Sequence, residues 1–152
     1  MSASKELKVP AIKEGTVIDH IPSRVTFKVM RILALNEFEH VVSVVINLKS
    51  KTGNKKGIIK VGSRVLTPEE VDKIAILAPH ATINIIENYE VTKKTKVELP
   101  EEFHNIVKCS NPKCITNSEQ VSTLFHVIKK DPLQVICNHC ERVMEQSDIK
   151  LI

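Results

Sequence analysis

The sequence predicts an α+β protein in two parts: a ferredoxin-like antiparallel sheet with two helices on one face, and a small all-β domain after it. Two observations support this prediction. The first hundred residues read as strand, helix, strand, strand, helix and strand, in the order of a ferredoxin-like unit. All four cysteines of the 152-residue chain lie in its last third. We therefore expect two domains, residues 1–100 and residues 101–152.

The first strand is expected over residues 16–21, and the first helix over residues 23–35. The strand segment alternates in polarity and is rich in β-branched side chains. Pro22 suits the beginning of a helix, and apolar side chains recur behind it at helical spacing. A regular strand would point Asp19 and His20 to opposite faces, so we do not expect them to form a catalytic pair.

Residues 41–48 form an almost continuous β-branched run, which predicts a strand in the centre of the sheet. The next stretch, residues 49–64, contains six Lys and Arg residues and no acidic residue. Gly53 and Asn54 mark a turn within it, so a hairpin edged with ammonium groups is expected. These charges either discourage pairing with other chains or bind phosphate groups.

The second helix is expected to begin at Thr67 and to end at Pro79. Thr67 and Glu70 have the spacing of a capping box, in which each side chain bonds the backbone of the other residue. Residues 82–91 then alternate in polarity, which predicts the last strand of the first domain. Further cations follow this strand, at Lys93, Lys94 and Lys96.

The cysteines follow the pattern C-x4-C-x22-C-x2-C, at Cys109, Cys114, Cys137 and Cys140. Two close pairs separated by an insert have the spacing of a tetrahedral metal site, and four thiolates select Zn²⁺. Two disulfides are the alternative, disfavoured because nothing at the N-terminus resembles a secretion signal. We expect one structural zinc ion in a small all-β zinc-binding domain, with strands near residues 121–128 and 133–136.

The positive charge lies in the first part of the chain. Residues 1–100 carry 16 Lys and Arg against 11 Asp and Glu, whereas residues 101–152 carry 6 against 7. A zinc module that binds nucleic acid is normally basic, so this composition disfavours a nucleic-acid-binding zinc ribbon, which stays the alternative function. The basic first part is suited to a phosphorylated ligand.

An enzyme is not expected. Four thiolates leave no open zinc position for a substrate, and the chain has no Walker loop, no G-x-S-x-G elbow and no cysteine outside the metal set. Nor is a membrane protein expected, because no apolar run approaches the ~20 residues of a membrane span. Reduced cysteines predict a cytoplasmic location.

Four stretches of the sequence, in order, resemble the regulatory chain of aspartate carbamoyltransferase. They are residues 15–22, residues 78–84, residues 88–91 and the four cysteines. The resemblance implies a subunit without catalytic activity, whose first domain binds ATP or CTP as allosteric effectors, CTP typically inhibiting and ATP activating. It further implies a zinc domain that contacts the catalytic chain, a homodimer of regulatory chains, no nucleic-acid partner, and a role in pyrimidine biosynthesis.

The resemblance also implies the residues of each site. Asp19 and Lys60 would contact the ribose, while His20 and Lys94, with Lys56 nearby, would contact the phosphates. The implied nucleotide site comprises Val9, Ala11, Ile12, Val17, Asp19, His20, Lys56, Lys60, Asn84, Ile86, Tyr89, Val91 and Lys94. The implied surface for the catalytic chain includes Asn111, Lys113 and Glu141. Pro10 and Lys113 depart from the residues typical of the family, and plain solubility is the alternative role for the polar side chains beside the cysteines.

Overall fold

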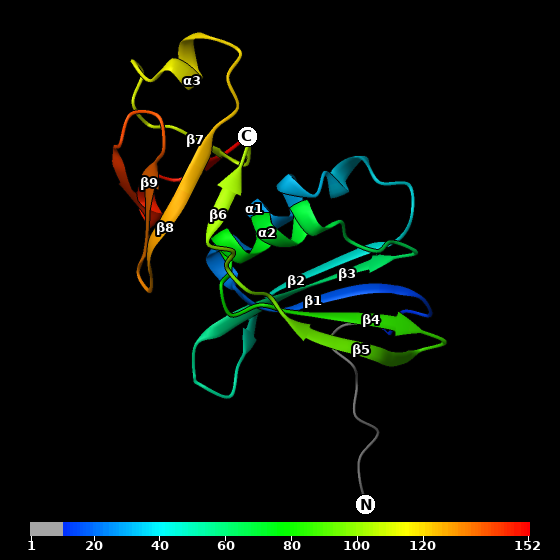
Figure 1. Ribbon diagram of the computed structural model, residues 1–152. Helices are drawn as coiled ribbons and strands as arrows, with labels where there is room; N and C mark the ends of the chain where they lie inside the picture. The colour runs from blue at the N-terminus through cyan, green and yellow to red at the C-terminus, as the bar shows by residue number, and fades with distance from the viewer. Residues whose placement is uncertain (1–10) are drawn as a thin grey trace, which may run out of the picture. The chain divides into compact units, whose positions relative to one another are not determined.

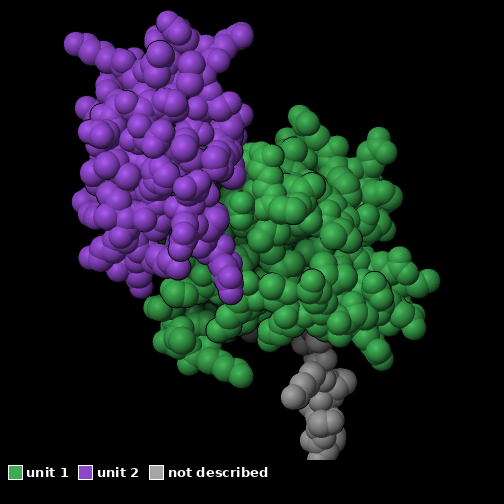
Figure 2. Space-filling view, in the orientation of Figure 1, with its two compact units in different colours: residues 1–97 green, residues 98–152 purple. Residues whose placement is uncertain are grey.

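The computed structural model describes residues 11–152, so the implied nucleotide contact at Val9 and the departure at Pro10 lie outside the described residues. The chain divides into two compact units, Met1–Val97 and Glu98–Ile152, which Figure 2 colours separately. We call them unit 1 and unit 2. None of the helices in the described part of the chain has the length and apolar character of a membrane span.

Unit 1 is a five-stranded antiparallel sheet with both of its α-helices on one face (Figure 1). The spatial order of its strands is β2-β3-β1-β4-β5, which is the ferredoxin-like order with β5 added beside β4. The predicted fold class is therefore confirmed. The strands are β1 (Gly15–Pro22), β2 (Val42–Lys49), β3 (Lys55–Gly62), β4 (Thr82–Glu87) and β5 (Glu90–Lys96), and the helices are α1 (Thr26–Ile32) and α2 (Pro68–Leu77).

The core of unit 1 lies between the helices and the sheet. Ile18 on β1 stands directly opposite Ile59 on β3 and Ile83 on β4, and none of the three is more than 8% exposed. Val29 of α1 and Ile74 of α2 are also fully buried, on the two helices that lie over one face of the sheet. Each such side chain contributes about 1.5–3 kcal/mol by leaving water. The helix-covered face of the sheet is thus the apolar one.

The predicted capping box at the beginning of α2 is present. The backbone N–H of Glu70 donates to Thr67 Oγ1 at 3.2 Å, and the N–H of Thr67 donates to Glu70 Oε1 at 3.0 Å. These two bonds satisfy N–H groups that the first turn of a helix leaves without partners. The second carboxylate oxygen of Glu70 accepts from Arg64, whose Nη1 also donates to the carbonyl of Leu33 at 2.9 Å.

The prediction that residues 41–48 form a central strand is wrong. In the described part of the chain β2 lies at the edge of the sheet and pairs only with β3. The residues from Val42 to Ile46 are all half-buried rather than buried. A continuous apolar run usually indicates burial on both faces, but here the run forms an apolar edge strand whose outer side meets no other strand of the described residues.

Two other predicted elements are interrupted. The strand expected over residues 82–91 ends at Glu87, because Asn88 and Tyr89 both adopt positive φ (50° and 65°) and turn the chain back into β5. The helix expected over residues 23–35 contains only seven α-helical residues, flanked by the short 3-10 turns η1 (Ser23–Val25) and η2 (Leu35–Glu37).

Unit 2 is built from short strands around two buried phenylalanines. Phe103 and Phe125 stand opposite each other on neighbouring strands, and both are fully buried. The sheet order is β10-β9-β8-β6, with β11 and β7 as a separate pair. The elements are β6 (Glu102–His104), β7 (Val107–Lys108), α3 (Ile115–Ser118), β8 (Leu124–Lys130), β9 (Leu133–Cys137), β10 (Val143–Glu145), η3 (Gln146–Asp148) and β11 (Lys150–Leu151).

Candidate functional site

Unit 2 brings the four predicted cysteine ligands together. Their Sγ atoms all lie within 4.8 Å of one another, with Cys109 3.6 Å from Cys140 and Cys114 3.8 Å from Cys137. Four thiolates bound about 2.3 Å from one tetrahedral ion would lie about 3.8 Å apart, whereas a disulfide requires about 2.05 Å. All four thiols are free. The arrangement fits a structural metal ion and excludes the disulfide alternative.

Two tight turns hold these thiols in place. In the first turn, the N–H of Cys114 donates to the carbonyl of Asn111 at 3.0 Å, and the Asn117 amide donates to the carbonyls of Cys109 and Asn111 at 2.8 and 2.7 Å. In the second turn, the N–H of Glu141 donates to the carbonyl of Cys137 at 2.9 Å. Each turn thus has hydrogen bonds of its own, and Arg142 Nη1 joins the two turns by donating to the carbonyl of Ser110 at 3.5 Å.

Burial opposes ionisation of the thiols. It raises the pKa of Cys109 to about 12 and also raises the pKa of Cys137. Burial also acts to raise the pKa of Cys140. Hydrogen bonds from the backbone of Arg142 and, to a smaller extent, from the side chain of Asn111 outweigh this effect and lower the pKa of Cys140 to about 7. Because a metal binds the thiolate form, metal binding to this set is coupled to release of the thiol protons.

The residues implied for the catalytic-chain surface lie beside the cysteine turns. Asn111 and Lys113 belong to the first turn, where Asn111 Oδ1 accepts from the N–H of Lys113 at 3.0 Å. Glu141 follows Cys140 with a positive φ of 62°. Lys113 and Glu141 are exposed and Asn111 is half-buried. All three are placed by the same backbone that holds the metal ligands.

In unit 1, four residues of the implied nucleotide site form one row across four strands. Val17 on β1 stands opposite Lys60 on β3 and opposite Asn84 on β4, and Asn84 stands opposite Lys94 on β5. Residues directly opposite one another share a face of the sheet. The adjacent row belongs to the helix-covered core, so this row lies on the other face. That face thus carries two ammonium groups and an amide side by side.

The amide of Asn84 is an unusual member of this row. Its Oδ1 is buried and has no hydrogen-bond partner among the described residues. A buried acceptor without a partner costs about 1–3 kcal/mol, and such groups are uncommon in native structures. The unpaired oxygen marks this point of the sheet as suited to a ligand that donates a hydrogen bond.

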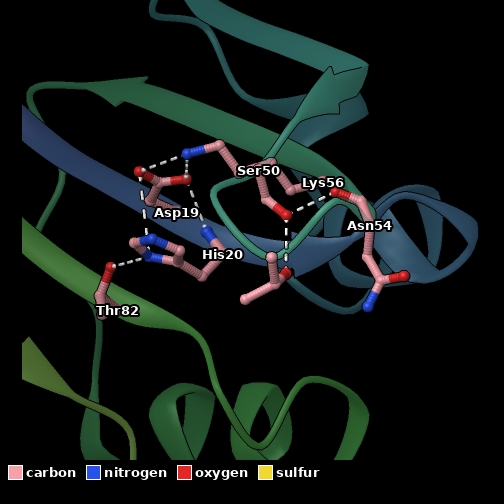
Figure 3. A network of polar contacts seen from close by, with 7 residues as sticks. Asp19, His20, Ser50, Asn54, Lys56 and Thr82 are labelled. Carbon is pink, nitrogen blue, oxygen red and sulfur yellow. Dashed lines mark hydrogen bonds and ion pairs between the residues drawn. The ribbon is translucent and has the colours of Figure 1, made fainter.

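Two residues beyond Val17 on β1, a small polar network surrounds Asp19 (Figure 3). Lys56 Nζ lies 3.1 Å from Asp19 Oδ1, and the backbone N–H of His20 donates to the same oxygen at 2.6 Å. The imidazole Nδ1 of His20 lies 3.0 Å from the hydroxyl of Thr82. The side chains of Asp19 and His20 therefore lie close together, with His20 Nδ1 4.0 Å from Asp19 Oδ2.

This proximity corrects the expectation that Asp19 and His20 point to opposite faces. The register of β1 against β3 shifts between Ile18 and Ile21, and His20 adopts a positive φ of 59°. The bulge removes the regular alternation of the strand. Thr82 was not among the predicted site residues, and only the pairing of β1 with β4 reveals its contact with His20.

The electrostatics of the row depend on Lys60. Burial lowers the pKa of the Lys60 ammonium, and the nearby carboxylate of Asp19 partly offsets this effect. An added anion, such as a phosphate or a ribose-linked phosphate, would favour the charged form of this lysine further. The chemistry of this face of the sheet is therefore that of an anion-binding surface.

The residues implied for base contacts lie at the other end of β1 and in the β4–β5 turn. Ala11 and Ile12 line a cavity of ≈ 400 Å³ together with residues of the β2–β3 end of the sheet. The N–H of Tyr89 donates to the carbonyl of Lys13 at 3.0 Å, which ties the turn to this segment. Ile86 is 8% exposed, whereas Tyr89 is 63% and Val91 57% exposed.

Comparison with known proteins gives one consistent result. Two family models match the chain, described as the allosteric domain (residues 7–98) and the metal binding domain (residues 101–150) of the aspartate carbamoyltransferase regulatory chain. The regulatory chain of Pyrococcus horikoshii is 54% identical over 146 residues, covering 95% of this chain and 96% of that one. That of Bacteroides fragilis is 47% identical over 153 residues, covering 100% of both, and that of Thermococcus sibiricus is 52% identical over 143 residues, covering 94% and 95%.

Proposed function

This chain belongs to the family of aspartate carbamoyltransferase regulatory chains, and from that membership we propose that it senses ATP and CTP and adjusts the activity of a catalytic chain. Unit 1 binds the nucleotide and unit 2 attaches the subunit to the catalytic chain. The relatives carry the name of a regulatory chain, which is the non-catalytic subunit of the enzyme. The nucleic-acid-binding alternative is not favoured, because both units match the regulatory-chain family.

The observation that carries the nucleotide proposal is the row of Lys60, Val17, Asn84 and Lys94 on the open face of the sheet. Its two ammonium groups suit the phosphates and ribose oxygens of a nucleotide, and the buried Oδ1 of Asn84 accepts a hydrogen bond that the chain itself does not supply. Asp19 accepts from the ribose hydroxyls and Lys60 donates to a ribose oxygen, while His20, Lys56 and Lys94 contact the phosphates.

The base lies against the apolar end of the site in this proposal. Ala11 and Ile12 offer a small cavity, and the turn at Tyr89 is hydrogen-bonded to the same segment. Ile86 and Val91 stand opposite each other on β4 and β5 and complete the apolar lining. Backbone groups near this edge accept either a purine or a pyrimidine, which suits a site that takes both ATP and CTP. The role of Val9 falls outside the described residues.

The metal in unit 2 is zinc in this proposal, with one ion per chain. Four thiolates at mutual distances close to those of a tetrahedral site select Zn²⁺ and leave no position for a substrate. The ion stabilises the two turns that carry Asn111, Lys113 and Glu141, so these residues are presented to the catalytic chain as one surface. A metal site of four free thiols supports a cytoplasmic location as part of this proposal.

The edge strand β2 offers a surface for the proposed homodimer of regulatory chains. Its outer side meets no other strand of the described residues, and Val42, Val44, Val45 and Ile46 are half-buried apolar residues. An exposed apolar edge of this kind is a liability unless another chain covers it. Pairing of two β2 strands would give each copy a partner on this side.

Regulation then follows from a difference in affinity. ATP and CTP stabilise different arrangements of unit 1, and the assembly shifts between less active and more active states accordingly. A coupling free energy of about 1–3 kcal/mol is enough to change the apparent substrate affinity about 5- to 150-fold. No chemistry at the regulatory chain itself is needed.

A matched pair of variants tests the nucleotide site. Lys94→Ala removes the ammonium group opposite Asn84, whereas Lys93→Ala removes its exposed neighbour, which stands opposite Ile85 on the other face of the sheet. Calorimetry should show weaker binding of both ATP and CTP for Lys60→Ala and Lys94→Ala, and unchanged binding for Lys93→Ala. Equal affinity in all three variants would count against this face of the sheet as the nucleotide site.

A further inference from the structure

Unit 2 carries a second set of metal-ligating side chains, on the face of its sheet opposite the phenylalanine core. Glu102 and His104 are two residues apart on β6 and so point to the same side. His126 on β8 stands directly opposite Glu102. The buried pair Phe103 and Phe125 occupies the other face. We call Glu102, His104 and His126 the outer cluster.

One carboxylate contacts both imidazoles in the outer cluster. Glu102 Oε2 lies 3.2 Å from His104 Nε2, and Glu102 Oε1 lies 3.5 Å from His126 Nδ1. Oxygen and nitrogen ligands at about 2.0–2.2 Å from one ion lie about 3.0–3.6 Å from each other. Each imidazole nitrogen thus lies at ligand distance from one oxygen of the shared carboxylate.

The second nitrogen of His126 has an oxygen partner of its own. His126 Nε2 lies 3.2 Å from Asn138 Oδ1, which can accept the N–H of this ring. In that tautomer the lone pair of Nδ1 faces Glu102 Oε1 and is available to a metal ion. A metal-ligating histidine typically donates its other N–H to an oxygen in this way.

We propose that the outer cluster binds a divalent transition-metal ion, of the Zn²⁺, Ni²⁺ or Cu²⁺ class, in addition to the ion held by the four cysteines. Two imidazoles and one carboxylate are ligands that this class of ion prefers. Glu101, Glu102 and His126 also line a hollow of ≈ 300 Å³, in which water ligands can complete the coordination; Lys130 is another of its lining residues.

Closure around the ion requires one side chain to turn. Among the described residues only the four thiols already have all their ligand atoms within 4.8 Å of one another. The side chain of His104 is 71% exposed, so its imidazole can rotate toward the ion without displacing core atoms. Once bound, the ion holds β6 to β8 at the first strand of unit 2 and stabilises that pairing.

The test uses the full chain with its cysteine site loaded with zinc, and Ni²⁺ as the probe. Ni²⁺ favours nitrogen and oxygen ligands, so zinc content measured before and after titration shows whether the thiolate site has been left intact. Calorimetry should detect one saturable Ni²⁺ site per chain. NMR should show that the imidazole resonances of His104 and His126 change when Ni²⁺ is added.

Three variants and one control decide the outcome. Glu102→Gln, His104→Gln and His126→Gln should each weaken Ni²⁺ binding about 10-fold or more. Replacing even a residue that only hydrogen-bonds to a metal ligand lowers metal affinity by about that factor. His80→Gln removes an exposed histidine of unit 1 and should change nothing. Retention of zinc by every variant shows that unit 2 remains folded. No saturable Ni²⁺ binding, or equal binding in all four variants, would overturn the proposal and leave a proton as the sole bridge between these groups.

Discussion

The buried oxygen of Asn84 gives the sharpest test of the nucleotide site, because one substitution should raise stability and lower affinity. Asn84→Leu replaces the amide by an apolar side chain of similar shape. In the free chain, Asn84 Oδ1 is buried without a partner among the described residues. Removing this unpaired acceptor should stabilise unit 1 by up to about 1–3 kcal/mol, the cost of leaving such a group unsatisfied.

The same substitution removes the hydrogen bond that we propose a nucleotide makes with this oxygen. A loss of about 1–3 kcal/mol corresponds to a Kd about 5- to 150-fold higher. Native-state hydrogen exchange of the β4 amides measures the first effect, and calorimetry with ATP and CTP measures the second. Lys93→Ala, on the opposite face of the sheet, serves as the binding control. A destabilised variant that binds both nucleotides normally would refute the reasoning, since Asn84 would then serve the fold and not the ligand.

Three further predictions concern the helix cap, the row lysine and the metal. Thr67→Ala should lower the free energy of unfolding of unit 1 by about 1 kcal/mol, because it removes the acceptor for the Glu70 N–H; denaturant unfolding measures this loss, and Ser at the same position should restore most of it. Lys60 has a pKa lowered from 10.5, chiefly by burial. As pH rises from that lowered pKa toward 10.5, the unfolded chain holds more protons than the folded one, so the free energy of unfolding should rise while nucleotide affinity falls. Lys60→Met should abolish both trends. Trends that persist in this variant would assign them to another group. Removing the metal with a mercurial reagent should release one ion per chain and unfold unit 2. Circular dichroism should show that unit 1 keeps its secondary structure. A unit 2 that stays folded without its ion would contradict a structural role for the metal.

Local chemistry made several features predictable from the sequence alone. The cysteine spacing predicted one four-thiol site because two short turns need no knowledge of the rest of the fold. The capping box at Thr67 and Glu70 was equally local, since both bonds form within one helical turn. The order of strands and helices then predicted the ferredoxin-like sheet of unit 1.

Features that depend on tertiary context were missed. The apolar run in β2 indicated a central strand, but its position at the edge depends on which strands pair. The alternation of residues 82–91 concealed a turn, because Asn88 and Tyr89 fit a strand pattern until both adopt positive φ. The bulge that brings Asp19 and His20 together likewise has no clear signature in a run of alternating residues.

The candidate site likewise has features that the sequence predicts and features that only the tertiary structure shows. Resemblance to a family supplied most of its residues, but only the register of four strands shows that Lys60, Asn84 and Lys94 share one row. The contact between His20 and Thr82 and the unpaired oxygen of Asn84 also arise from the fold and not from residue type. The arrangement of Glu102 with His104 and His126 has no motif spacing at all, because it joins two strands separated in the chain.

The central claim is that nucleotide bound to unit 1 alters a catalytic chain attached to unit 2. The most direct measurement is the substrate-saturation curve of the assembly reconstituted from this chain and catalytic chains, recorded without nucleotide, with ATP and with CTP. We predict that the two nucleotides move the substrate concentration at half-saturation in opposite directions, and that Lys94→Ala removes both shifts. Identical curves under all three conditions, in an assembly that calorimetry shows to bind both nucleotides, would contradict the claim.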